Sequence, residues 1–419
     1  MFLGQTELVG EATTSEGVED AAMAWAAGRA RREANGLAPG STAVLSSSAG
    51  VITPTDSSPD RIPATMVARP RPLLVGIARL AAEAPREAGK RAVEYFRLPV
   101  RSLLNRVVSE RVEFGWSINP YRGCEFGCQY CYARYTHEYM ELGPAEFERK
   151  IYVKENAARV LARDLNPEKL RGEHIAIGTA TDPYQPAERM FGVTRQILET
   201  LLAWSEQVPH GLVSFSLTTK SNLVVRDAEL LARLHARQPV HVNFSLTTLK
   251  PRLARLLEPR APRPDLRLEA LRQLREAGLV AGVFLSPVLP DITDKPEDLE
   301  AVVSAAAQAG ACYLAGQVVF LMPSAQQKFF PFLKDKFPRL VKHYRKWYAR
   351  AGYAPAAYRA HIRGVLAGLR RRYHLAAQPP APDLYTTGWP ASSPQLPLPF
   401  APARVGEKTP CRQQPCALA

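Results

Sequence analysis

Between about Val112 and Phe320, short apolar runs rich in β-branched residues alternate with longer segments of helical periodicity. This alternation constrains the fold most, because strands that alternate with helices form parallel β/α units with right-handed crossovers. We therefore predict an α/β fold, a partial (β/α)6 barrel whose functional residues follow the strand ends. The predicted strands are Phe114–Ile118, Ile175–Thr179, Val213–Thr218, Val240–Leu246, Val280–Val288 and Tyr313–Phe320.

The predicted helices between these strands have recognisable ends. Asp227 and Asp265 are expected to cap helix starts, and Gly278 and Gly310 are expected to end helices. Ile151–Lys154 is predicted as a further edge strand. The helices are Glu155–Leu165, Thr194–Trp204, Asp227–Ala236, Leu266–Ala277 and Pro296–Ala309.

The segments that flank the barrel lack this alternation. Before it, only Ala21–Ala34 and Leu73–Phe96 have helical spacing; after it come helices broken at Pro331, Pro338 and Pro355. The chain beyond Leu375 is rich in proline and is expected to be extended. The predicted divisions are a largely disordered extension (1–95), the barrel (96–322), a C-terminal helical segment (323–375) and a Pro-rich disordered tail (376–419).

Cys124, Cys128 and Cys131 form a C-x3-C-x2-C array directly after the first predicted strand. Three thiolates this close predict a metal site. An iron–sulfur cubane normally takes four cysteines, so three leave one iron open to a small molecule. The alternative is a zinc knuckle with His137 as fourth ligand, although structural zinc sites usually pair two half-sites and no second pair lies nearby.

The spacing of these cysteines, with Tyr130 just before the last one, resembles the signature of the radical S-adenosylmethionine (radical SAM) enzymes. The resemblance implies a [4Fe-4S] cluster held by the three cysteines and SAM bound to the open iron, with Tyr130 at the cofactor. It also implies cleavage of SAM to a 5′-deoxyadenosyl radical and the partial barrel predicted above.

Polar residues at the end of the second predicted strand suit a SAM pocket. Thr179, Thr181 and Asp182 belong to the string Gly178–Glu188, G-T-A-T-D-P-Y-Q-P-A-E. In the wider family the corresponding segment accepts the SAM ammonium. For Asp182 alone, a structural turn is an equal alternative, because T-D-P-Y is good turn chemistry.

The next two strand ends carry Lys220 and Ser245. A lysine in a partly buried pocket is a natural partner for the SAM carboxylate, with a solvent-facing loop lysine as the alternative. Ser245 is expected to hydrogen-bond the SAM amino acid moiety, with a strand serine bonded to its own backbone as the alternative.

Two further strings are expected in the same pocket. Glu258, Arg260 and Arg267 could close over SAM or substrate, although surface ion pairing is the more common arrangement for any one of them. Ser286–Ile292, with its two prolines, is expected to form a rigid wall against the adenine, as in this superfamily.

The densest resemblance is to the spore photoproduct lyase-like group, often labelled "DNA repair photolyase", over about Arg101–Pro323. It rests on the strings N-P-Y-R-G-C-E-F-G-C-Q-Y-C-Y-A-R, T-D-P-Y-Q-P-x-E, T-K-S…R-D, S-L-T-T and L-E-P-R-A-P. Lys220 and Ser245 match the positions that hold SAM in spore photoproduct lyase. The resemblance implies a radical SAM carbon–carbon lyase.

The chain departs from that group in one respect. Spore photoproduct lyases have a further cysteine that returns a hydrogen atom to the substrate radical, whereas here none lies between Cys131 and Cys312. Cys312 opens the last strand, at the wrong end of the barrel, and is expected to be a small buried hydrophobe. No catalytic residue is predicted, and a tyrosine such as Tyr132, Tyr135 or Tyr184 is a speculative substitute.

The formal net charge of +14 predicts attraction to polyanions, and we expect a nucleic acid, DNA, as partner. Arg101–Arg111 and Arg363–Arg372 would hold phosphates. Gln395–Phe400, Q-L-P-L-P-F, resembles peptides that dock on the bacterial DNA sliding clamp, although so short a motif also arises by chance. A reductase or flavodoxin-like electron donor is a further expected partner.

Alternatives to this function remain open. Heavy use of alanine, arginine and proline could account for the charge, and the substrate would then be a peptide or small molecule. A non-enzymatic metal-binding module is the third possibility. Sparse cysteines, the lack of a secretory signal and the lack of a long apolar run predict a cytoplasmic protein that does not span a membrane.

Overall fold

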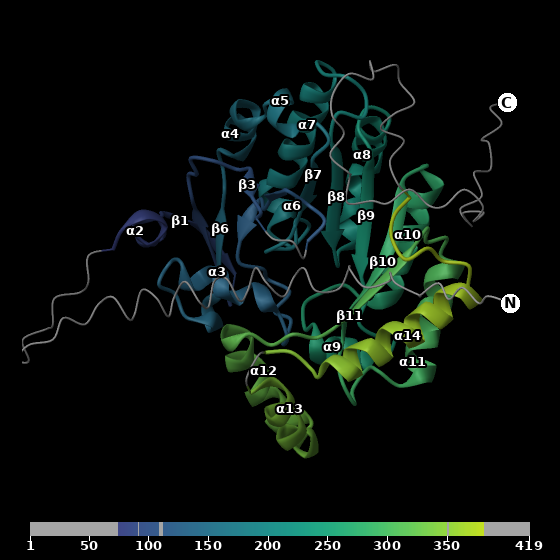
Figure 1. The fold of residues 1–419 in the computed structure, drawn as a ribbon. Helices are drawn as coiled ribbons and strands as arrows, with labels where there is room; N and C mark the ends of the chain where they lie inside the picture. Colours follow the sequence, from purple (N-terminus) through teal and green to yellow (C-terminus); the bar gives the residue numbers. More distant parts are fainter. Residues whose placement is uncertain (1–73, 91, 109–111, 350–351, 381–419) are drawn as a thin grey trace, which may run out of the picture.

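The computed structural model describes residues 74–90, 92–108, 112–349 and 352–380. Its main sheet has the order β11-β10-β9-β8-β7-β4-β3, and every neighbouring pair from β4 to β11 is parallel (Figure 1). The six parallel strands confirm the predicted partial barrel. They are β4 (Trp116–Ile118), β7 (His174–Ile177), β8 (Ser214–Thr219), β9 (Val240–Ser245), β10 (Val280–Val288) and β11 (Leu314–Val318), with β3 (Asn105–Arg106) antiparallel to β4.

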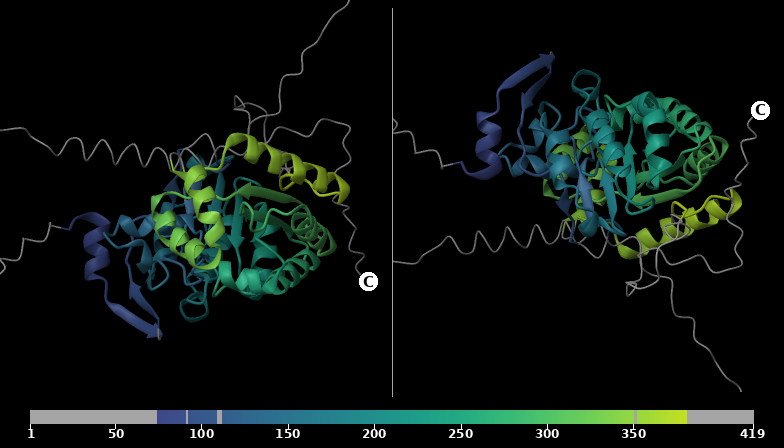
Figure 2. Two further views of the ribbon diagram at one scale, coloured as in Figure 1. Left: turned by 90° about the horizontal axis from the view of Figure 1, so that it is seen from below. Right: turned by 90° about the horizontal axis from the view of Figure 1, so that it is seen from above.

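Helices between the strands cover one face of the curved sheet (Figures 1 and 2). Gly278 and Gly310, at φ 80° and 82°, end α10 and α11 as predicted. The two predicted side-chain caps do not form. Asp265 lies in the first turn of α10, because that helix begins at Pro264. Asp227 directly precedes α8, but its side chain makes no cap hydrogen bond. The helices are α4 (Ala157–Asp164), α5 (Pro167–Leu170), α6 (Glu188–Phe191), α7 (Val193–Ser205), α8 (Ala228–His235), α9 (Pro251–Leu257), α10 (Pro264–Glu276) and α11 (Pro296–Gln308).

Alternation along the strands gives the main sheet an apolar face and a polar face. Residues such as Phe215, Leu217 and Val242 are buried in the main core that the helices share. The residues between them in sequence are polar and form the inner face of the barrel. Ordered from strand start to strand end, they are Ser214, Ser216 and Thr218 on β8, and His241, Asn243 and Ser245 on β9.

A second sheet with the order β1-β2-β6-β5 lies beside the barrel. Its strands are β1 (Arg86–Lys90), β2 (Val93–Arg97), β5 (Tyr121–Arg122) and β6 (Lys150–Val153). β6 lies between β2 and β5, so the edge-strand prediction for Ile151–Lys154 is wrong.

This second sheet also corrects the predicted helix over Leu73–Phe96. The helix α2 spans only Gly76–Glu83, because Pro85 follows and the chain then forms the β1–β2 hairpin. Pairing with β6 gives Val93 and Tyr95 buried places in the core, which outweighs helical spacing. Within 74–95 the predicted disorder is therefore replaced by α2 and this hairpin.

The C-terminal helical segment contains α12 (Pro323–Lys336), η4 (Pro338–Leu340), α13 (Val341–Tyr348) and α14 (Ala356–Arg372). Pro331 lies inside α12, so the break predicted there is wrong. Burial of Phe329 and Leu333 on either side of it stabilises the continuous helix. Pro338 and Pro355 do mark helix boundaries.

The chain after α14 returns to the sheet. Tyr313 and Ala376 form a parallel bridge, and α14 packs so closely on β11 that a Cβ on Gly316 would lie 2.4 Å from Leu366 Cδ1. None of the described helices has the length and apolar character needed to cross a bilayer. The predicted segments Ala21–Ala34 and Gln395–Phe400 lie outside the described residues.

Candidate metal and cofactor site

The cysteine loop, residues 119–139, begins where β4 ends and lies across the ends of the parallel strands. The Thr181 hydroxyl and the Gln185 amide donate to the Gly123 carbonyl, at 2.6 and 3.1 Å. The Glu125 N–H donates to Gln185 Oε1 at 2.9 Å. Gly123 has a φ of 84°, and a Cβ there would lie 2.8 Å from two carbonyl oxygens, so this turn requires glycine.

The other side of the loop is bonded to the end of α9 and to the segment after it. Gln129 N–H donates to the Leu257 carbonyl at 2.9 Å, and Arg260 N–H donates to the Phe126 carbonyl at 3.2 Å. The loop is thus bonded to residues that follow β7 and residues that follow β9. Its cysteines are thereby fixed over the barrel mouth, which we define as the strand-end opening of the barrel.

Arg134 stabilises the loop from within. Its fully buried guanidinium donates to the Cys128 carbonyl at 3.0 Å and pairs with Glu148. Glu148 also binds Lys328 of α12 at 2.7 Å. A chain of three charged side chains therefore connects the cysteine loop to the C-terminal helical segment.

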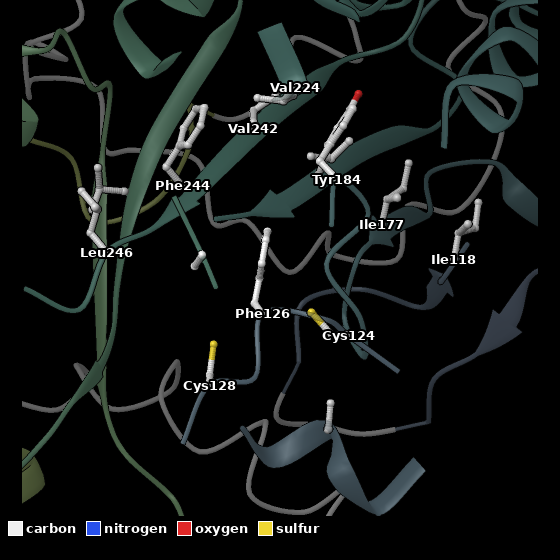
Figure 3. Close-up of a cluster of buried hydrophobic side chains, with 14 of the residues drawn as sticks. Ile118, Cys124, Phe126, Cys128, Ile177, Tyr184, Val224, Val242, Phe244 and Leu246 are labelled. Atoms are coloured by element: carbon white, nitrogen blue, oxygen red, sulfur yellow. The ribbon is translucent and has the colours of Figure 1, made fainter. Parts of the chain in front are cut away.

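Two of the three thiols, Cys124 and Cys128, are buried, and Cys131 is half-buried. Cys124 and Cys128 are buried in one cluster with Phe126 and Phe244 (Figure 3). Burial raises the pKa of all three thiols, and Asp182 raises that of Cys124 further, while Arg134 opposes the rise for Cys131. A bound metal would supply the positive charge that such thiols need to ionise. Three sulfur donors on one short loop are the ligand type that suits a thiophilic metal or an iron–sulfur cluster.

His137 is placed as a core residue. Its ring is buried, its Nε2 lies 3.0 Å from the Lys150 carbonyl, and it packs edge-on against Phe147. Burial lowers the pKa of His137 to about 4. In the described part of the chain, no three His, Cys, Asp or Glu side chains, the three cysteines included, are grouped to hold a single metal ion. These observations disfavour the zinc knuckle.

Lys220 and Ser245 meet at the strand ends, as their predicted shared role requires. The ammonium donates to Ser245 Oγ and lies 3.7 Å from the Glu258 carboxylate and 5.9 Å from the centre of the Tyr130 ring. An ammonium has three donors, and Ser245 is its one hydrogen-bond partner among the described residues. Lys220 therefore retains the capacity to bind a carboxylate ligand.

Glu258 is the centre of a buried network beneath Lys220. Its carboxylate accepts from Tyr130 Oη, from Thr247 Oγ1 at 3.0 Å and from Arg267. Burial alone would raise the pKa of Glu258, but Arg267 and Lys220 outweigh it and lower this pKa to about 2. Surface ion pairing is thus wrong for Glu258 and Arg267, since both are almost fully buried, whereas Arg260 is exposed.

Thr179, Thr181 and Asp182 support the loop and its neighbours. Thr179 Oγ1 accepts from Asn119 at 3.0 Å, and Thr181 binds Gly123 as described. Asp182 accepts from Thr219 Oγ1, Lys220 N–H and Tyr184 N–H at 2.7, 2.7 and 2.9 Å. Burial raises the pKa of Asp182 despite these hydrogen bonds. Three accepted bonds favour the structural turn for Asp182, and the SAM contacts of these residues stay predictions.

The candidate hydrogen-atom donors are also placed. Tyr132 Oη donates to the Thr179 carbonyl, Tyr184 Oη donates to Asp227 at 3.0 Å, and Tyr135 packs edge-on against Tyr139. Cys312 is buried just before β11, at the strand-start end of the barrel. It therefore lies away from the cysteine loop, as expected.

Sequence reasoning missed several residues that shape this site. Gln185 belongs to the polar string Gly178–Glu188, so a signal for it exists. Arg134 and Thr247 belong to the strings N-P-Y-R-G-C-E-F-G-C-Q-Y-C-Y-A-R and S-L-T-T, so a signal exists for them as well. Glu148 gives no signal, because its partner Lys328 is distant in sequence. The wall segment Ser286–Ile292 touches the site through the Ser286 carbonyl, which accepts from Ser245 at 3.0 Å.

Comparison with known proteins agrees with this site. Uncharacterized protein Rv2578c of Mycobacterium tuberculosis is 37% identical over 285 residues, which cover 67% of this chain and 82% of the relative. The family model described as "Radical SAM superfamily" matches residues 118–303, from the end of β4 through α11. The chain belongs to the radical SAM superfamily.

Other similarities of this radical SAM protein are weaker. Uncharacterized protein MJ0683 of Methanocaldococcus jannaschii is 29% identical over 54% of this chain and 73% of the relative. Spore photoproduct lyase complexed with dinucleoside spore photoproduct is 14% identical, with a TM-score of 0.49 over 67% of this chain and 79% of that one. SuiB of Streptococcus suis bound to S-adenosylmethionine has a TM-score of 0.31 over 53% of this chain and 44% of that one.

Proposed function

We propose that the protein is a radical SAM enzyme that acts on nucleic acid, with DNA as the first candidate and with chemistry of the spore photoproduct lyase type. The observation that carries the proposal is the placement of Cys124, Cys128 and Cys131 across the strand ends, next to the Lys220 ammonium. A metal-binding loop and a ligand-binding cation thus meet at the barrel mouth, where β/α barrels carry their active sites.

In this proposal Cys124, Cys128 and Cys131 hold a [4Fe-4S] cluster. When bound, such a cluster and SAM together supply a 5′-deoxyadenosyl radical that abstracts a hydrogen atom from the substrate. Lys220 binds the SAM carboxylate through donors that Ser245 does not use. Glu258 stays ionised, holds Lys220 in place by charge and is itself held by Arg267 and Tyr130.

The nucleic-acid part of the proposal rests on charge and on the sequence resemblance. The formal net charge of +14 favours polyanions, and phosphate neutralisation dominates affinity for nucleic acids. The clamp-like string Gln395–Phe400 remains a prediction, as do the electron donor and the cytoplasmic location.

The test is release of 5′-deoxyadenosine from SAM by the reconstituted, reduced protein, measured without DNA, with intact duplex and with ultraviolet-irradiated duplex. Cys128→Ala, which should bind no cluster, is the control for background cleavage. Stimulation by irradiated duplex alone supports a repair lyase. Equal slow release in all three samples supports radical SAM chemistry but contradicts DNA as substrate. No release from protein with about four irons per chain, as a cubane requires, contradicts the enzyme itself.

A further inference from the structure

The positive charge of this protein is concentrated in one segment. Residues 323–375 contain 13 of the 54 lysines and arginines but only one of the 40 acidic residues, Asp335. The rest of the chain is close to neutral. The net charge of +14 is therefore a property of the C-terminal helical segment, and a uniformly basic composition does not explain it.

Helices α12 and α13 of this segment lie at the barrel mouth (Figures 1 and 2). α12 begins just after β11 ends, and its Lys328 binds Glu148 beside the cysteine loop. α13 is attached to the segment after β10, since Tyr344 Oη donates to the Pro290 carbonyl at 2.8 Å and His343 lies 2.8 Å from Asp291. Both helices are thus fixed next to the proposed reaction site.

The inner side of α13 is anchored by aromatic packing. Tyr344 and Tyr348 are buried, and Tyr344 packs on Phe329 of α12 with ring centres 5.4 Å apart. Tyr348 Oη also donates to the Val319 carbonyl at 3.2 Å. The outer side of the helix is therefore presented on a rigid support.

That outer side is basic and lacks carboxylate partners. We define the basic surface as the exposed residues Lys334, Arg339, Lys342, Arg345 and Lys346. None of the five forms an ion pair within the described residues, whereas Arg272 of α10 pairs with both Glu269 and Glu276. Lys342, Arg345 and Lys346 are spaced i, i+3 and i+4, so their charges lie on one face of α13 and repel one another. A bound polyanion would relieve this repulsion.

The chemistry of the basic surface fits nucleic acid better than an acidic protein. Protein interfaces usually have an apolar centre, whereas nucleic-acid interfaces are polar and strongly positive. The exposed large hydrophobic side chains of the described residues lie elsewhere, on α6, α9, α10 and segments between helices, with none on α12 or α13.

We propose that the basic surface binds the phosphate backbone of a nucleic acid and holds the strand over the barrel mouth. This inference rests on the proposed function and deepens it by assigning the binding surface. Because phosphate contacts carry no sequence information, binding here is independent of sequence and strongly dependent on salt.

The test compares two triple variants of the full chain. One is Lys342→Gln/Arg345→Gln/Lys346→Gln, in the basic surface. The control is Arg159→Gln/Lys169→Gln/Arg233→Gln, which removes equal charge from exposed residues of α4, α5 and α8. Fluorescence anisotropy with a labelled mixed-sequence duplex is measured across a series of salt concentrations. Iron content and 5′-deoxyadenosine release without nucleic acid report on the rest of the protein.

We expect the α13 variant to bind duplex at least tenfold more weakly at about 0.1 M salt. The slope of the logarithm of the binding constant against the logarithm of the salt concentration should become less negative by about 0.9 for each phosphate that the variant no longer neutralises. Iron content and SAM cleavage should be unchanged, the control should bind like the parent, and Lys342→Arg/Lys346→Arg should also bind like the parent.

Unchanged duplex affinity and salt slope in the α13 variant would overturn the inference, even if the parent binds and the proposed function stands. A parent that binds no nucleic acid would instead contradict the proposed function and the inference together. If the α13 variant binds duplex normally but is reduced more slowly by an acidic flavodoxin-type donor, the surface serves a protein partner and the inference is wrong.

Discussion

At the strand starts the inner face of the barrel carries His174 and His241, whereas at the strand ends it carries Lys220 and Ser245. The two rings at the starts stack 5.3 Å apart, and the nitrogens of His174 lie 2.7 and 2.8 Å from the hydroxyls of Ser214 and Ser216. Loss of water lowers the pKa of His174 to about 4 and that of His241 to about 3, so both rings are neutral near pH 7.

This difference distinguishes polar groups that stabilise the barrel from polar groups that can bind a ligand. At the starts, both ring nitrogens of His174 have protein partners, and the network carries no charge near pH 7. At the ends, Lys220 lies 3.7 Å from the Glu258 carboxylate, and its ammonium keeps donors that no described residue uses. Neutral groups that bind one another stabilise a barrel, whereas charged groups with spare hydrogen-bonding capacity are suited to bind a ligand. Each prediction below tests this contrast.

Two cysteine substitutions, one at each end of the barrel, should differ most in their effects on iron binding and SAM cleavage. Cys128→Ala at the mouth should abolish iron binding and SAM cleavage, because two thiols cannot hold the cluster. Cys312→Ala at the strand-start end should leave both unchanged. Iron analysis and 5′-deoxyadenosine release measure the outcome, and loss of iron from Cys312→Ala would contradict the assignment of the site to one end.

Glu258→Gln should cause the largest loss of stability. It leaves the Arg267 guanidinium buried without a counter-charge, and breaking a buried pair in this way costs about 3–5 kcal/mol. Urea denaturation monitored by circular dichroism measures the free energy of unfolding. Glu269→Gln, which breaks an exposed pair on α10, is the control and should change the free energy of unfolding far less. Equal effects would mean that the Glu258 network contributes no more to the free energy of unfolding than a surface ion pair does.

Lys220→Ala should keep the cluster and weaken SAM binding. A hydrogen bond to a charged group contributes about 1.5–3 kcal/mol, which corresponds to about 10- to 150-fold in the SAM dissociation constant. Lys250→Ala is the matched control, because Lys250 directly precedes α9 and is paired with Asp298 at 2.7 Å. If Lys220→Ala binds SAM as tightly as the parent in equilibrium dialysis, Lys220 is not a SAM ligand.

His174 and His241 should also respond to milder acid than Glu258, with a more modest effect. Their pKa values lie below the ordinary 6.5, as does that of His137 in the cysteine loop, so protons bind more tightly to the unfolded chain at all three residues. Stability should therefore fall as the pH drops from about 6.5 toward 4. Glu258, with a pKa of about 2, loses its contribution only between about 4.5 and 2.

The free energy of unfolding at pH 7.5 and pH 5.5 tests this order. His241→Gln should reduce the loss between the two pH values, while His210→Gln, at an exposed position, should not. An unchanged loss in His241→Gln would show that the strand-start histidines are not the acid-sensitive groups.

The same contrast shows what the sequence could predict. The six parallel strands were found within a few residues, because β-branched runs and helix-ending glycines are local signals. Motifs single out the cysteines, Lys220 and Ser245. For Glu258 and Arg267 the sequence favours surface ion pairing, and it cannot show their mutual burial because that depends on how α9 and α10 pack. The β1–β2 hairpin was missed because R-E-A-G-K lacks strand propensity and pairs only in the folded protein.

The way α14 covers β11 has a consequence for solubility. β11 is the last strand of the main sheet, and a bare last strand offers backbone groups that pair with other chains. Here Leu314 N–H donates to the Ala376 carbonyl at 3.0 Å, and Leu366 packs against Gly316. A chain that ended before Ala356 would expose this strand along its length and would self-associate edge to edge. The basic C-terminal segment therefore also keeps copies of the protein apart.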